Sequence, residues 1–146
     1  MSDTNRLSTN FTLTELTRTS SGIPNTINII ERRNLQSLVD NILQPARDRF
    51  GGPIMVNSGF RNEAVNRAVG GATTSQHRLG QAADIRGSDN ARIFNIIRDN
   101  LPFDQLIWEL GNDQQPQWIH VSFSDRHRRE VLRATMQGGR KVFTRM

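Results

Sequence analysis

Residues 75–84 read Ser75-Gln76-His77-Arg78-Leu79-Gly80-Gln81-Ala82-Ala83-Asp84, and a later segment reads Trp118-Ile119-His120. Together the two segments supply two imidazoles and one carboxylate. Three nitrogen or oxygen ligands from the protein leave one tetrahedral position of a zinc ion free, which is the arrangement of catalytic zinc sites. The sequence therefore contains a candidate metal site made of His77, Asp84 and His120.

The physical reason to expect a metal is the cost of burying these groups. A buried carboxylate beside two imidazoles is unfavourable without a cation or hydrogen-bond partners. Ala82 and Asp84 project from one side of a strand predicted at residues 81–86, and His77 must fold over to join them. The alternative is a surface loop histidine at 77, a turn or cap residue at 84 and a half-buried strand histidine at 120. These residues alone leave both interpretations open.

Composition limits the class of protein. The 146 residues suit a single domain, with residues 1–10 expected to be a flexible start and residues 124–146 a basic C-terminal segment. With no cysteine, disulfides and thiolate metal sites are excluded, so zinc would need His, Asp or Glu ligands.

The charge pattern indicates a polyanionic partner. The formal net charge is +5, and basic residues cluster within 126–133 and 140–145. No nucleic-acid recognition motif or aromatic platform accompanies them, so we expect no specific nucleic-acid partner. No apolar run is long enough to cross a membrane, and we expect neither membrane insertion nor a signal peptide.

Helix signals are clear at several positions. Residues 12–15 and 28–31 have the spacing of a capping box, which predicts a helix start at each. The second helix should be kinked or split by Pro45 and end at Gly51. Ser88 is expected to cap a further helix that ends before Pro102. The buried face of the main helix is predicted to comprise Ile30, Leu35, Leu38, Val39, Ile42, Leu43, Ala46 and Phe50.

Strands are expected on either side of the candidate metal site. Residues 53–57 predict a strand that delivers Arg61 in the loop beyond it, and residues 62–69 predict a helix. Residues 105–123 predict a hairpin with its loop at 112–115. This register pairs Leu106 with Val121, Trp108 with Ile119 and Leu110 with Gln117 on the core side. Glu109 and His120 then lie on the opposite face as diagonal neighbours, with backbones about 7 to 8 Å apart.

These residues match a known family. The pattern Ser75-x-His77-x-x-Gly80-x-Ala82-x-Asp84, followed by Trp118-x-His120-x-Ser122, closely resembles the zinc D-alanyl-D-alanine carboxypeptidase family of peptidases. That family includes bacteriophage endolysins that cut the peptide stems of peptidoglycan. The resemblance also covers Phe11-Thr12-Leu13-x-Glu15-Leu16 and Ser58-Gly59-Phe60-Arg61 with Val65-Asn66, so it spans most of the chain.

The resemblance implies a small α+β fold, in which helices pack on an antiparallel sheet, and zinc held by His77, Asp84 and His120. Arg61 matches the family's substrate arginine, which would stabilise a carbonyl oxygen or grip a substrate carboxylate. Ser75 matches a position that can contact substrate, although a loop serine is as often a backbone cap.

Glu109 is the candidate general base. Several branches of the family place Glu or His three residues before the last zinc histidine, where this chain has Gln117, expected on the core side. Another branch has an acid further upstream, as Glu109 is here. Trp118 is a candidate for the cleft wall, with simple packing as the alternative. We expect His127 to be a surface residue, and we assign residues 138–143 no catalytic role.

The predicted function is zinc-dependent hydrolysis of peptide bonds in peptidoglycan stem peptides, by a monomeric phage lysis enzyme. We expect it to be made in the cytoplasm of a bacterial host and to act on the cell wall after release. The alternative is a non-catalytic zinc-stabilised module of the same fold, like the signalling domain of hedgehog proteins. The presence of Arg61 and Glu109 favours the enzyme.

Overall fold

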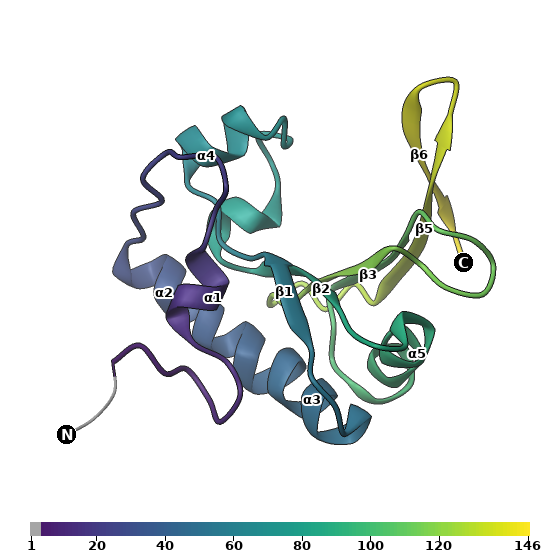
Figure 1. Ribbon diagram of the computed structural model, residues 1–146, viewed down its shortest axis with the longest axis horizontal. Helices are drawn as coiled ribbons and strands as arrows, with labels where there is room; N and C mark the ends of the chain where they lie inside the picture. Colours follow the sequence, from purple (N-terminus) through teal and green to yellow (C-terminus); the bar gives the residue numbers. More distant parts are fainter. Residues whose placement is uncertain (1–3) are drawn as a thin grey trace.

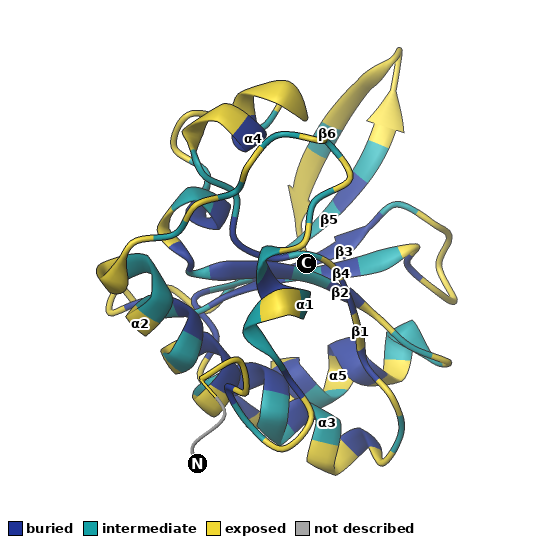
Figure 2. Ribbon diagram, turned by 60° about the vertical axis from the view of Figure 1, so that its left-hand side comes forward, coloured by how far each residue is buried: buried dark blue, intermediate teal, exposed yellow. Residues whose placement is uncertain are grey.

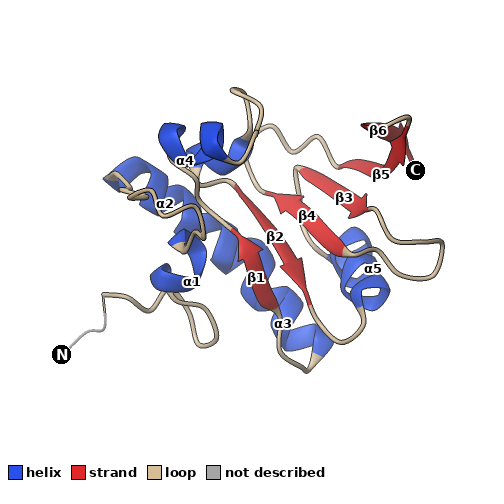
Figure 3. Ribbon diagram, turned by 45° about the horizontal axis from the view of Figure 1, so that its top comes forward, coloured by secondary structure: helices blue, strands red, loops and turns tan. Residues whose placement is uncertain are grey.

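A computed structural model describes residues 4–146 as an α+β fold with a six-stranded mixed sheet. Figure 3 shows the strands in the order β1-β2-β4-β3-β5-β6. The helical segments are α1 (Leu13–Thr17), α2 (Ile29–Leu38), a π-helical turn η1 (Val39–Leu43), α3 (Gln44–Phe50), α4 (Glu63–Ala68), a 3₁₀ turn η2 (Gln76–Leu79) and α5 (Asn90–Asn100). The strands are β1 (Met55–Ser58), β2 (Ala82–Arg86), β3 (Gln105–Glu109), β4 (Trp118–Ser122), β5 (Glu130–Gln137) and β6 (Arg140–Arg145).

The α+β class expected from the resemblance is confirmed. The neighbouring strands run antiparallel, as expected, except that β5 pairs with β3 in parallel. The end of β4 lies beside the start of β3, and residues 123–129 carry the chain past that start to the other edge of β3, where β5 runs parallel to it. Sequence analysis did not predict the parallel pair.

The β3–β4 hairpin has the predicted register. Leu106 pairs with Val121 and Trp108 with Ile119, and all four side chains lie in the core. The loop closes where the backbone N–H of Asn112 donates to the carbonyl of Gln115 at 3.0 Å. The predicted core face nevertheless ends at Trp108: Leu110 has a left-handed φ of 57° and is half-buried, and Gln117 is exposed.

The main helical segment is split, as Pro45 predicted, but the break begins earlier, at the π turn η1. The backbone N–H of Gln44 donates to Val39, five residues back, so Pro45 falls in the first turn of α3, where its missing N–H costs nothing. Gly51 ends α3 in a left-handed conformation, as predicted. The predicted buried face is correct except for Ile30, which is 57% exposed in the first turn of α2.

The helix starts follow from local capping. Thr12 and Asn28 each form the predicted capping box, with Glu15 and Glu31 respectively. For α5 the cap is Asp89 rather than Ser88, because the Asp89 side chain accepts a hydrogen bond from the backbone N–H of Arg92 at 3.1 Å. The predicted position of this cap was therefore wrong by one residue.

The two faces of the sheet have different environments. Helices α2, α3 and α5 lie below the sheet in Figure 1, and the apolar side chains of that face form one buried cluster with them. On the other side, α4 and the β5–β6 hairpin project away from the sheet and leave its central strands between them. Figure 2 shows buried residues along the central strands and mostly exposed residues on α4 and β6. Within residues 4–146, no helix is long and apolar enough to span a membrane.

The two ends of the chain are more integrated than expected. Residues 1–3 of the segment expected to be flexible lie outside the described residues. From Thr4 onward the chain packs on the domain: Leu7 is only 7% exposed, and Arg6 forms an isolated bridge with Thr12. At the other end, residues 130–145 supply the two strands that complete the sheet.

Candidate active site

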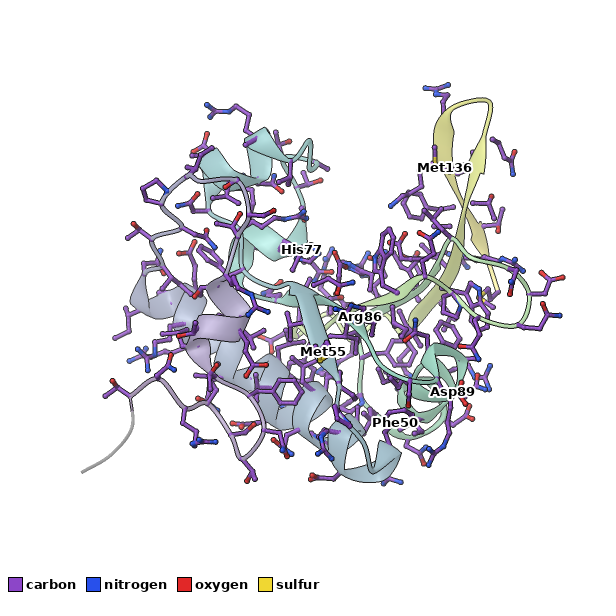
Figure 4. All side chains as sticks on the ribbon, in the orientation of Figure 1. Phe50, Met55, His77, Arg86, Asp89 and Met136 are labelled. Carbon is purple, nitrogen blue, oxygen red and sulfur yellow. The ribbon has the colours of Figure 1, made fainter. Side chains whose placement is uncertain are left out.

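The three candidate metal ligands converge on the open side of the sheet. Asp84 on β2 is the direct cross-strand partner of His120 on β4, and η2 carries His77 over them. One ligand atom from each residue lies within 4.8 Å of the other two. Figure 4 shows His77 at the base of the space between α4 and the β5–β6 hairpin. The structure thus brings together the three residues that the sequence singled out.

The orientation of His77 is fixed by its second ring nitrogen. The Nδ1 atom lies 2.7 Å from the carbonyl oxygen of Gly59, and the residue is only 2% exposed. A carbonyl oxygen can only accept a hydrogen bond, so Nδ1 carries the proton. In the neutral ring Nε2 then has a free lone pair, and this atom lies 3.4 Å from Oδ1 of Asp84.

This arrangement fits a metal cation. The lone pair of His77 Nε2 and a carboxylate oxygen are both electron donors, and they repel unless a cation lies between them. Nδ1 of His120 approaches the same Oδ1 atom at 3.1 Å. Two imidazoles and one carboxylate are a zinc donor set, and a backbone carbonyl that orients one imidazole is a common outer contact. His77, Asp84 and His120 therefore could hold a zinc ion.

Electrostatics favour the ionised form of Asp84. Burial opposes ionisation of Asp84, but its contacts with His120 and His77, where these imidazoles carry a proton in the absence of metal, outweigh burial and hold the pKa of Asp84 well below its ordinary value. Burial lowers the pKa of the Arg61 guanidinium, and the attraction of Asp84 opposes this effect. An ionised carboxylate is the form that binds a metal.

Two glycines in the quoted motifs allow η2 to approach the rest of the fold. Gly80 ends η2 with a φ of +74°, and a Cβ there would lie 2.4 Å from the carbonyl oxygen of Glu31. A Cβ on Gly59, whose carbonyl orients His77, would lie 2.4 Å from the carbonyl oxygen of Leu16. These positions need glycine because any side chain would push away the backbone that positions His77.

A second buried carboxylate, Asp104, holds the turn that carries His77. It has no exposed surface and accepts hydrogen bonds from Gln76 Nε2 at 2.9 Å and Ser124 Oγ at 2.8 Å. Arg128 donates to it from its backbone N–H and its guanidinium. Asp104 was not predicted, and its only sequence signal is an acid amid the apolar residues 101, 103 and 106. Gln76 directly precedes the metal ligand His77, and Asp104 directly precedes β3, so this network connects the turn that carries His77 to the start of β3.

The triad lies in an open cleft of about 790 Å³. Ser75, Trp118, Arg61 and Glu109 line the same cleft, so it contains every residue that the sequence analysis assigned to the site. Its further charged lining residues are Arg126, Arg128 and Lys141. His127 is exposed, as predicted, and neither it nor Gln117 lines the cleft.

Glu109 occupies the predicted position relative to the triad. Glu109 pairs with Trp118, which lies two residues before His120 on β4, so Glu109 is diagonal to His120 on the same face of the sheet. It is only 4% exposed, and Lys141 Nζ donates to its Oε2 atom at 3.0 Å. No catalytic role was predicted for residues 138–143, yet β6 places Lys141 beside the candidate base. Nothing local in the sequence predicts this contact, because it requires the parallel β3–β5 pair.

The other candidate residues have distinct contacts. Ser75 caps η2, because its Oγ accepts a hydrogen bond from the backbone N–H of His77 at 3.2 Å. The backbone N–H of Arg61 donates to the carbonyl of His77 at 3.0 Å. Within the described part of the chain, the buried Arg61 Nε and Trp118 Nε1 atoms have no hydrogen-bond partner. Lys141 Nζ lies 5.3 Å from the centre of the Trp118 ring.

Comparison with known proteins agrees with this geometry. The model of a family described as Peptidase M15 matches residues 9–122, which include the triad, Arg61 and Glu109. A zinc D-Ala-D-Ala carboxypeptidase of Streptomyces albus G is 50% identical over 44 residues. That match covers 30% of this chain and 17% of the Streptomyces protein. The family and the His-Asp-His cluster together indicate zinc as the cofactor, and the chain belongs to the peptidase M15 family.

Proposed function

We propose that this zinc peptidase hydrolyses peptide bonds in the stem peptides of bacterial peptidoglycan. The observation that carries the proposal is the meeting of the triad, Glu109 and Arg61 in one open cleft. The name of the Streptomyces relative, a D-Ala-D-Ala carboxypeptidase, supports a D-alanyl peptide as the substrate. Stem peptides carry free carboxylates, and the cations Arg61 and Arg126 at the cleft suit such a ligand.

In this proposal Glu109 moves the proton. Its carboxylate accepts a proton from the attacking water and returns it to the amine that leaves. Burial shields the carboxylate from bulk solvent, and the hairpin register directs it to the face that carries His120. Zinc, when bound by the triad, supplies Lewis acidity that polarises a carbonyl and lowers the pKa of water.

Arg61 binds the developing charge. Its guanidinium lines the cleft and would donate charge-assisted hydrogen bonds to the carbonyl oxygen of the scissile bond or to a substrate carboxylate. Trp118 and Ser75 would contact the peptide from the lining of the cleft. Each of these roles uses a side chain that the fold already holds beside the triad.

The proposal extends to a biological setting. We place the protein in phage lysis, as a monomer made in the cytoplasm of a bacterial host that reaches the wall after release. The formal net charge of +5 supports this setting, because an anionic cell wall attracts a basic protein. No nucleic-acid partner is part of the proposal.

Digestion of purified peptidoglycan tests the function. The zinc-loaded protein should release fragments whose new amino and carboxyl termini, identified by mass spectrometry, assign the bond that is cut. Chelation should stop the release, and zinc should restore it. If the zinc-loaded protein leaves walls and isolated stem peptides intact, the peptidoglycan proposal fails, and the zinc-stabilised binding module becomes the better interpretation.

A further inference from the structure

The β5–β6 hairpin forms one wall of the cleft although the family match ends at residue 122. In Figure 1 the hairpin stands opposite α4 across the open side of the sheet. Lys141 and Phe143, both on β6, line the cleft from this wall. The hairpin is therefore an element of the site that the family match does not account for.

Two strand pairings bring Lys141 to the site. The parallel β3–β5 pair sets Ala134 beside Glu109, and the antiparallel β5–β6 pair sets Phe143 beside Ala134. Lys141 is two residues from Phe143 and therefore on the same face of β6. Its ammonium reaches Oε2 of Glu109 at 3.0 Å and lies 5.3 Å from the centre of the Trp118 ring.

Lys141 has an unusual place in the composition of this chain. The sequence has 19 Lys and Arg residues, and Lys141 is the only lysine. An arginine fork tends to grip both oxygens of a carboxylate, whereas an ammonium is a point charge that can bond to one. A bond to Oε2 alone leaves the other oxygen of Glu109 available to accept a proton.

We propose that Lys141 is a positioning residue for Glu109, which rests on the proposed function in which Glu109 is the general base. The Glu109 side chain is 6% exposed, and burial of a carboxylate is unfavourable unless it has a hydrogen-bonded partner, which also fixes its orientation. Within residues 4–146, Lys141 is the one ion-pair partner of Glu109. Lys141 thus fixes the direction in which the base presents its free oxygen.

The decisive variant is Lys141→Met, which keeps an apolar stem but removes the charge. We expect unchanged zinc content, a fall in kcat of about ten- to a hundred-fold, and a KM within a few-fold of the parent, because misplacing a catalytic group by 1 Å can cost on the order of a hundred-fold. In a Glu109→Gln background the same change should have little further effect. A full additional loss in that background, or a parental or raised kcat in Lys141→Met alone, overturns the proposal.

The single lysine offers a conservative rescue. Reductive methylation keeps the positive charge of Lys141, whereas acetylation removes it. We expect the methylated protein to retain much more activity than the acetylated one. The Lys141→Met variant has no lysine, so acetylating it measures separately the effect of modifying the N-terminal amine. If methylation and acetylation reduce kcat equally, the charge of Lys141 does not position the base.

A spectroscopic readout is independent of turnover. The ¹⁵N ammonium signal of the sole lysine should shift in Glu109→Gln and stay unchanged in Gln117→Ala, because Glu109 accepts a hydrogen bond from the ammonium and Gln117 lies outside the cleft. An unchanged signal in Glu109→Gln contradicts the contact. If Glu109→Gln is inactive but Lys141→Met is not impaired, the proposed function stands and this inference fails. If Glu109→Gln is fully active, the proposed base is wrong, and the inference fails with it.

Discussion

The two walls of the cleft hold their carboxylates in different ways. On the η2 side, Asp104 has no exposed surface and accepts hydrogen bonds from Gln76, Ser124 and Arg128. On the hairpin side, Glu109 has a single ion-pair partner among residues 4–146, Lys141, whose side chain is 36% exposed. The turn that carries the metal ligand His77 is therefore held by several hydrogen bonds to Asp104, whereas the candidate base Glu109 is held by its ion pair with Lys141. Metal retention and turnover should therefore respond to different substitutions.

The largest effect is expected from removing a metal ligand. His120→Ala leaves two of three ligands, so we expect loss of zinc and of all measurable hydrolysis, with His77→Ala and Asp84→Ala behaving alike. Elemental analysis measures the zinc content of each purified protein, and we expect one zinc per chain in the parent. His127→Ala is the matched control, because His127 is exposed and outside the cleft. Zinc retained by His120→Ala but lost by His127→Ala would refute the ligand assignment.

The η2 wall can be broken at Asp104. Asp104→Asn replaces an acceptor with an amide that faces the donors of Arg128, and we expect a loss of about 3 kcal/mol in the free energy of unfolding. Urea denaturation measures it. Asp125→Asn, an exposed neighbour, should change stability by less than about 0.5 kcal/mol. Equal stability of the two variants would show that the buried network does not hold this wall.

The same carboxylate predicts an acid dependence. Burial opposes ionisation of Asp104, but hydrogen bonds from Arg128, Ser124 and Gln76 outweigh it and lower its pKa. A carboxyl with a lowered folded pKa stabilises the protein above its unfolded pKa of about 3.9, and this contribution disappears as the pH falls toward the folded pKa. Below about pH 4 the metal-free parent should thus lose stability more steeply than Asp104→Asn. Parallel pH profiles would contradict the assignment.

The smallest effect is expected at Ser75. Loss of its cap on η2 should cost about 1 kcal/mol in Ser75→Ala, with zinc retained and KM raised at most a few-fold. Thr74→Ala is the control, because Thr74 is exposed, lines the cleft and does not cap the turn. A large rise in KM at unchanged stability would instead make Ser75 chiefly a substrate contact.

Local patterns in the sequence were sufficient to predict two helix starts and the register of the β3–β4 hairpin. The capping boxes at Thr12 and Asn28 and the register that pairs Trp108 with Ile119 were correct, since each depends on residues close in sequence. The same register placed Glu109 on the face of His120. The triad also required long-range pairing of β2 with β4, which was not predicted. The resemblance implied the three ligands, which the residues alone left open.

The second wall could not be predicted from the sequence. Lys141 reaches Glu109 only through the parallel β3–β5 pair, and parallel pairing leaves no local periodicity that distinguishes it from a basic surface strand. Asp104 was missed for a similar reason, because Gln76 and Ser124, two of its partners, come from distant segments. The predicted burial of Ile30 and the predicted cap at Ser88 were wrong. Both lie at helix starts, where the cap and the exposure of a side chain can differ between neighbouring residues.

The most direct test of the central claim compares hydrolysis by Glu109→Gln and Gln117→Ala at matched zinc occupancy. The amide at 109 keeps the shape of the side chain and removes its proton acceptor, so we expect the rate of peptidoglycan digestion to fall by about 10² to 10⁴ while zinc and fold are retained. Gln117 is exposed outside the cleft, and its replacement should leave the rate near that of the parent. A Glu109→Gln protein that digests walls at nearly the parental rate would contradict the account.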